Sequence, residues 1–309
     1  HGRAAAAREA KADLLIAFGG GSVIDATKLI QLCLWADITE VDQLAPYRMG
    51  RGDDRKNASQ IPAGIRTIAI PTTLSAAEFT PFAGVTDGEK QVKESYTHPD
   101  FAPRAVILDP AITLDTPMRL WSSTGMKAID HAVEQLCNLE RSPMGDAVAA
   151  EGLRLLAKGL RATQDDPADL EARAACQHGM WLAISGAATG RGMGASHAIG
   201  HTLGGSYGVP HGITSCITLH ATLEWNRDYS VDRQTLVSRL MGKRALPAAD
   251  VVRDLVKTLG LPWRLSELLL GASHFRAIAE HTMHDRGIRT NPRPIRSADD
   301  IVEILELCA

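Results

Sequence analysis

The pattern of apolar and polar positions divides the chain into two regions of different character. In the first region, short apolar runs of strand length (LLIAF, RTIAIP and AVILDP) are separated by helical periodicity, as in VIDATKLIQLCLWA. Strands that alternate with helices indicate a parallel sheet with helices on both faces. From Met118 onward the apolar residues recur at helical spacing, without a convincing strand pattern. The pattern predicts an α/β domain over residues 1–115 and an all-helical domain over residues 116–309.

The first apolar run ends in the glycines of GGGS, which lead directly into a helical pattern. Glycines let the backbone approach a ligand closely, and the first turn of a helix offers unpaired N–H groups to an anion. The second run ends in PTT (Pro71 to Thr73). Ligands of open α/β sheets bind beyond the carboxyl ends of the strands, so both segments together favour a nucleotide site. Because GxGxxG and Walker patterns are absent, a tight turn that binds nothing is the alternative.

A cluster of polar groups is predicted on the helix GMKAIDHAVEQL. Lys127 and His131 are four residues apart and share a face, with Glu134 next along it. Asp130 is adjacent to His131 in sequence, so it points about 100° away and is a poor candidate for the same site.

Three further histidines follow in SHAIGHTLGGSYGVPHG. His197 and His201 are again four residues apart, and His211 follows a glycine-rich turn. Ala198 stands where the HExxH motif of metalloproteases needs its glutamate, so that function is excluded. A site shared by the four histidines is one interpretation; separate core or surface histidines are the other.

Composition narrows the classes of function. The formal net charge is −3, and no cluster of Lys and Arg is long enough to indicate nucleic-acid binding. The five cysteines are scattered and form no CxxC pair, which is typical of reduced thiols in the cytoplasm. No apolar run reaches the roughly 18 residues of a membrane span, and no signal peptide is visible. We therefore expect a cytoplasmic protein without nucleic-acid or membrane partners.

The order of motifs resembles the iron-containing (group III) alcohol dehydrogenase superfamily: GGGSVIDATK, IPTT, VILDP, GMKAIDHAVE, HAIGHTLGG, VPHG and TNPRPI. The resemblance covers essentially the whole chain except an N-terminal segment of about one βαβ unit, which we expect to precede His1. It implies a Rossmann-like dinucleotide-binding domain (N-terminally truncated), a C-terminal helical domain, and an active site in the cleft between them. It also implies NAD or NADP as the cofactor, and a homodimer is expected.

The resemblance assigns roles to individual residues. The cofactor-binding positions are Gly20, Gly21, Ser22, Asp25, Thr72, Thr73, Lys93 and Leu114. Of these, Gly20, Gly21 and Ser22 would hold the pyrophosphate, and Asp25 would support that loop. The catalytic positions are His201, Lys127, His131, His197 and His211, with His201 near the nicotinamide as the proton donor.

Two departures from the family pattern bear on a metal. Metal-dependent members carry an Asp at the position of Lys127, together with the histidines that match His131, His197 and His211. A protonated Lys127 has no lone pair and would repel Fe²⁺ or Zn²⁺, so we expect no metal. If one were bound, those three histidines would be its ligands. The loop LSAAE after PTT is shorter than the AGTGSE of metal-dependent members and is similar to that of the maleylacetate reductases.

The sequence thus predicts an NAD(P)H-dependent oxidoreductase that reduces maleylacetate, or a related small dicarboxylate, to 3-oxoadipate in the degradation of aromatic compounds. Lys127 and one or more of the histidines would stabilise the negative charge that develops on the substrate. One alternative is an alcohol or aldehyde oxidoreductase that depends on iron or zinc. A second alternative is a nucleotide-binding protein without catalytic turnover.

Overall fold

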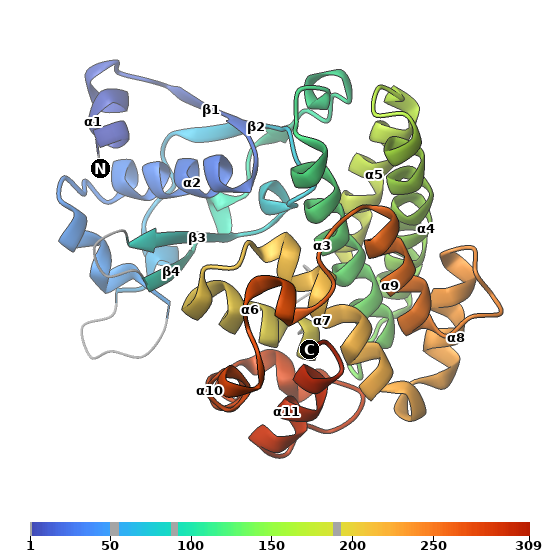
Figure 1. The fold of residues 1–309 in the computed structure, drawn as a ribbon. Coiled ribbons are helices and arrows are strands. Elements are labelled where there is room, and N and C mark those ends of the chain that lie inside the picture. The colour runs from blue at the N-terminus through green and yellow to red at the C-terminus, as the bar shows by residue number, and fades with distance from the viewer. Residues whose placement is uncertain (1, 50–55, 88–91, 188–192) are drawn as a thin grey trace. The chain divides into compact units, whose positions relative to one another are not determined.

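The computed structural model describes residues 2–49, 56–87, 92–187 and 193–309. The chain forms two compact units, His1–Thr113 and Leu114–Ala309. The first is an α/β unit and the second is helical throughout its described part, so the predicted fold class is confirmed (Figure 1). None of the described helices combines the length and the apolar character that crossing a membrane requires.

The first unit is built on a small parallel sheet in the order β1-β2-β5, and each strand is one of the predicted apolar runs. Strand β1 spans Leu14–Gly19, β2 spans Arg66–Pro71 and β5 spans Ala105–Val106. In the register of the first pair, Leu14 lies beside Arg66 and Gly19 beside Pro71. The last residues of the two strands therefore lie next to each other. The segments that follow them both start at the carboxyl end of the sheet.

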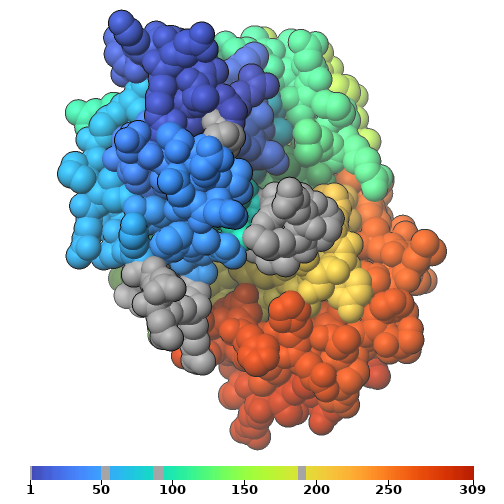
Figure 2. All heavy atoms as spheres, turned by 90° about the vertical axis from the view of Figure 1, so that its left-hand side faces the viewer, coloured from blue at the N-terminus to red at the C-terminus, as the bar shows by residue number. Residues whose placement is uncertain are grey.

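Helix α2 (Gly21–Trp35) covers one face of this sheet, where Ala17, Ile24 and Ala69 form a small core. The side chains that alternate with Ala17 along β1 point the other way, and Ile16 and Phe18 are 63% and 56% exposed. The expectation of helices on both faces is therefore wrong for the described part of the chain. Helix α1 (Gly2–Glu9) lies at the surface of the first unit, where Figure 2 shows it in dark blue.

The sequence patterns did not predict the antiparallel hairpin of β3 (Phe82–Asp87) and β4 (Val92–Thr97). Neither strand alternates apolar with polar residues, so the usual signal of a half-buried strand is missing. The hairpin is fixed to α2 by Lys28, a buried side chain whose Nζ donates to the carbonyl oxygens of Ala77 and Phe82, each at 2.6 Å.

The second unit begins with α3, the long helix that carries Lys127 and His131. The described helices are α3 (Met118–Cys137), α4 (Pro143–Asp165), α5 (Leu170–Ala187), α6 (Ala195–Tyr207), α7 (His211–Trp225), α8 (Val231–Leu240), α9 (Ala248–Thr258), α10 (Ala272–Thr282) and α11 (Ala298–Glu306). Helix α3 is buried along most of its length and contacts α4, α5, α6 and α7. Its burial explains why residues on more than one of its faces contribute to the site described below.

Helices α4 and α5 approach each other closely through glycines. A Cβ atom on Gly152 would lie 2.8 Å from both the backbone nitrogen of Ala183 and the carbonyl oxygen of Gly179. Backbone atoms cannot move aside as a flexible side chain can, so a larger residue would force the helices apart.

We expect Gly152→Ala to lower the free energy of unfolding by about 1–3 kcal/mol, because overpacking outweighs the better helix propensity of alanine. Chemical denaturation measures this. The control is Gly205→Ala in α6, where a Cβ meets nothing within 4 Å and stability should be unchanged or slightly higher. Equal stability of the two variants would contradict the close packing of α4 on α5.

Candidate active site

The glycine loop joins the end of β1 to the start of α2. Gly19 ends β1 with a φ of +146°, and Gly20 is the N-cap residue of α2. The carbonyl oxygen of Gly19 accepts the N–H of Thr72 at 3.1 Å, and a Cβ on Gly20 would lie 3.0 Å from Cγ2 of Thr73. The GGGS and PTT segments thus meet at the carboxyl end of the sheet. The first N–H groups of α2 point there and could bind a phosphate.

The remaining predicted cofactor positions lie in different settings. Ser22 is exposed in the first turn of α2. Asp25 accepts the N–H of Gly84 in β3 at 3.1 Å and lies 3.5 Å from Nζ of Lys28, so its described contacts are with the hairpin and with its own helix rather than with the glycine loop. The backbone of Lys93 lies in β4, but its side chain is outside the described part of the structure. Leu114 is 43% exposed at the start of the second unit.

The four predicted histidines form one cluster in the second unit. Helix α3 contributes His131, α6 contributes His197 and His201, and α7 begins with His211. The ring centroids of His131 and His197 are 4.9 Å apart, those of His201 and His211 are 5.4 Å apart, and both pairs are stacked. The rings of His197 and His211 are 5.9 Å apart, edge to face. These contacts support the interpretation that the four histidines share a site, rather than being separate core and surface residues.

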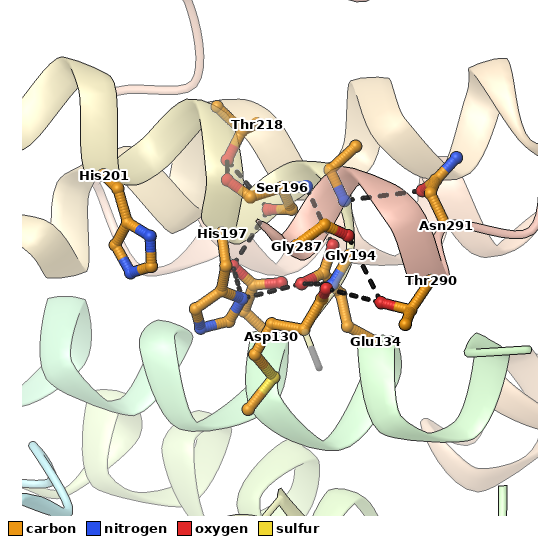
Figure 3. Close-up of polar contacts among 12 residues, drawn as sticks. Asp130, Glu134, Gly194, Ser196, His197, His201, Thr218, Gly287, Thr290 and Asn291 are labelled. Atoms are coloured by element: carbon orange, nitrogen blue, oxygen red, sulfur yellow. Dashed lines mark hydrogen bonds and ion pairs between the residues drawn. The ribbon is translucent and has the colours of Figure 1, made fainter. Parts of the chain in front are cut away.

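Two buried carboxylates lie against His197. Oε2 of Glu134 is 2.8 Å from Nδ1 of His197, and Oδ2 of Asp130 is 3.5 Å from the same nitrogen (Figure 3). The inference that Asp130 points away from the site is therefore wrong. Asp130 does lie on a different face of α3 from His131, but α6 packs against that face and brings His197 and Ser196 to it.

Burial controls the protonation of this cluster. It lowers the pKa of His197 to about 4 and that of His131 well below its usual value, and the positive charge of Lys127 acts in the same direction on both. Burial also raises the pKa values of Asp130 and Glu134 to about 7. Both buried imidazoles are therefore neutral at pH 7, and Lys127, which is half-buried, supplies a positive charge beside them.

His201 has an acidic partner that the sequence did not reveal. Its Nδ1 lies 2.8 Å from Oδ2 of Asp285, whose Oδ1 accepts the N–H of Gly287 at 2.7 Å. Burial alone would raise the pKa of Asp285, but the hydrogen bond and charge of His201 outweigh it and hold that pKa below its ordinary value. The two residues are 84 positions apart in the sequence, so no local spacing indicates the pair.

The donor set allows a test of whether a metal fits. Nε2 of His197 and Nδ1 of His131 are buried without a hydrogen-bond partner among the described residues, and neutral imidazoles are good ligands for zinc and iron. Asp130, Glu134 and His197 also present ligand atoms within 4.8 Å of one another. The chemistry of these side chains therefore fits a divalent metal. His131, His197 and His211 would hold it. The ammonium of Lys127 opposes it.

Comparison with known proteins places both units in one family. Residues 2–110 match the model "Iron-containing alcohol dehydrogenase" and residues 122–308 match "Fe-containing alcohol dehydrogenase family, C-terminal". The chain is 33% identical to the dehydrogenase FUM7 of Gibberella moniliformis, over 98% of this chain and 78% of that protein. It is 31% identical to a maleylacetate reductase of Burkholderia cepacia, over 80% of this chain and 68% of the relative.

Among solved structures, a putative alcohol dehydrogenase of Ralstonia eutropha JMP134 has a TM-score of 0.82 at 32% identity, covering 99% of this chain and 77% of the other. Matches of this extent, over both units, show the family and its chemistry. The chain belongs to the iron-containing alcohol dehydrogenase family and is an NAD(P)-dependent oxidoreductase.

Proposed function

We propose that the protein is a reductase of maleylacetate or a closely related unsaturated oxo-dicarboxylate, with NADH or NADPH as the reductant and 3-oxoadipate as the product. The observation that carries the proposal is a cluster of four histidines with Lys127 at the position where metal-dependent relatives carry Asp. The similarity to a maleylacetate reductase and the short LSAAE loop support the same substrate class.

The residues of the first unit would hold the dinucleotide. Its pyrophosphate would bind the N–H groups at the start of α2, beside Gly20 and Gly21, whose lack of side chains lets this loop pack closely on Thr73 and Ser75. When bound, the reduced nicotinamide supplies a hydride.

The residues of the second unit would stabilise the negative charge that develops on the substrate and donate a proton to it. As the conjugated double bond of the substrate is reduced, its electron pair shifts toward the ketone oxygen, which becomes an enolate. The Lys127 ammonium stabilises that charge, since a donor held in place by the fold does not have to be reoriented as water does. His201 then gives one proton to the carbon beside the ketone, so that one hydride and one proton have added across the double bond. Asp285 orients the His201 ring during this transfer.

A second candidate function is a metal-dependent alcohol or aldehyde oxidoreductase. The unpartnered Nε2 of His197, together with the family to which the chain belongs, favours it. A divalent ion on His131, His197 and His211 would polarise a carbonyl oxygen as a Lewis acid. We rank this function second because Lys127 brings a positive charge to the same cluster.

Turnover separates the two functions. Purified protein is assayed for oxidation of NADH and of NADPH with maleylacetate, with butanal and with buffer alone. The proposal expects kcat/KM to be highest for maleylacetate with at least one of the cofactors. A higher kcat/KM for the aldehyde would favour the second candidate. Cofactor binding without oxidation of either coenzyme would contradict both.

We expect Asp285→Asn to lower kcat on maleylacetate by roughly 5- to 30-fold, because His201, whose side chain is 53% exposed, loses a hydrogen bond to a carboxylate that is worth about 1–2 kcal/mol after solvent screening. The asparagine oxygen can still accept the N–H of Gly287, so the local backbone is preserved. The matched control is Ser206→Ala, which removes another hydrogen bond to a histidine (Ser206 Oγ to His281 Nδ1, 2.9 Å) and should leave kcat unchanged. If both variants keep wild-type kcat, Asp285 has no role in the reaction.

A further inference from the structure

We propose that Glu134 is a positioning residue that fixes His197 in one tautomer, with hydrogen on Nδ1 and the lone pair of Nε2 directed into the histidine cluster. The inference concerns the protonation site of one ring and does not depend on which substrate is reduced.

The contacts of the Glu134 carboxylate determine the tautomer. Its Oε2 accepts the N–H of Gly194 at 2.8 Å and lies 2.8 Å from Nδ1 of His197, while its Oε1 accepts the N–H of Ser196 at 2.8 Å (Figure 3). An ionised carboxylate only accepts hydrogen bonds. Both of its oxygens already accept a backbone N–H, which suits the ionised carboxylate better than the carboxylic acid, so in the ionised form Nδ1 of His197 carries the hydrogen that Oε2 receives.

The same carboxylate fixes where His197 lies. Helix α6 begins at Ala195, and the N–H groups that Glu134 accepts belong to its N-cap residue, Gly194, and to its second residue, Ser196. Glu134 on α3 therefore caps α6 and holds the following residue, His197, by its side chain. Gly194 is closely fitted to this arrangement, since a Cβ there would lie 2.7 Å from Oε1 of Glu134. Capping and ring orientation are thus set by a single group.

As a consequence, the histidines of the cluster differ in whether they can donate a hydrogen bond. With hydrogen on Nδ1, the buried Nε2 of His197 is an acceptor, and it has no hydrogen-bond partner among the described residues. It can accept from an ammonium or a hydroxyl group, or bind a metal, but it cannot donate to an anion. In this tautomer His197 therefore cannot stabilise an enolate by donating a hydrogen bond.

The test is the protonation state of the ring nitrogens by NMR of protein labelled with ¹⁵N-histidine, in the absence of substrate. The His197 signals are assigned by their loss in His197→Gln. At a pH above 7, where the Glu134 carboxylate is ionised, the wild type is expected to show a protonated Nδ1 and an unprotonated Nε2. The opposite tautomer in the wild type would overturn the proposal, and this measurement needs no other variant to fold.

Two variants then test the role of Glu134 itself. Glu134→Gln has one acceptor oxygen where the carboxylate has two, and its NH2 group cannot accept from Nδ1, so the Nδ1-protonated form should lose population or exchange with the other tautomer. Asp130→Asn is the matched control: it removes another buried carboxylate from α3, but its oxygen is 3.5 Å from Nδ1, longer than a normal hydrogen bond, and the tautomer should not change. An unchanged tautomer in Glu134→Gln, or the same change in both variants, would contradict the assignment. Neither result depends on turnover, so failure here is distinct from failure of the proposed function.

Discussion

Lys127→Ala is expected to lower kcat/KM on maleylacetate by roughly 30- to 1,000-fold. One charge-assisted contact to the developing enolate, or to a substrate carboxylate, is worth about 2–4 kcal/mol. Steady-state kinetics at saturating cofactor measure the loss. Lys158→Ala, which removes an exposed lysine from α4, is the matched control and should keep wild-type kinetics. A Lys127→Ala enzyme with full activity would show that the lysine is a bystander.

The complementary change, Lys127→Asp, should act in two opposite ways. It creates the Asp and three-histidine set that the family resemblance implies for metal-dependent members, so the variant should gain bound zinc or iron. It also places a negative charge beside a dianionic substrate, so maleylacetate reduction should fall below that of Lys127→Ala. Mass spectrometry of the metal content and kinetics on the same preparation measure both effects. A metal-free Lys127→Asp variant would contradict the assignment of these four positions to one site.

Gly21→Val is expected to abolish binding of NADH and NADPH. A Cβ on Gly21 would lie 2.8 Å from Oγ and 3.0 Å from Cβ of Ser75, so a branched side chain must displace the loop where the pyrophosphate is expected. Quenching or enhancement of coenzyme fluorescence measures the affinity. Gly2→Val in α1 is the control, because a Cβ there meets nothing within 4 Å. Unchanged affinity in Gly21→Val would refute the loop as the cofactor site.

Sequence patterns predicted those features of the fold that depend on residues close together in the chain. The strand, glycine and helix order of the first unit follows from apolar periodicity, and the pairs Lys127–His131 and His197–His201 follow from helical spacing. The family resemblance then predicted that the segments carrying these histidine and lysine residues form one site. The prediction that all four histidines share a site agrees with the ring contacts between α3, α6 and α7.

Tertiary packing determined the features that the patterns missed. Asp130 reaches His197 because α6 packs against its side of α3, and Asp285 reaches His201 across 84 residues of sequence. The role of Glu134 depends on the start of α6 lying over its carboxylate, a position that spacing along α3 cannot give. Such contacts join segments that are distant in sequence, so the periodicity of a single helix cannot predict them.

We propose that this cluster works through the charge of Lys127 rather than through a resident metal. The most direct test is the metal content of wild-type protein, purified from medium that contains iron and zinc, together with the maleylacetate reductase activity of the same sample before and after treatment with a chelator. We predict substoichiometric iron and zinc, and activity that the chelator does not change. One equivalent of iron or zinc per chain, with activity lost on chelation and restored by the metal, would contradict the claim.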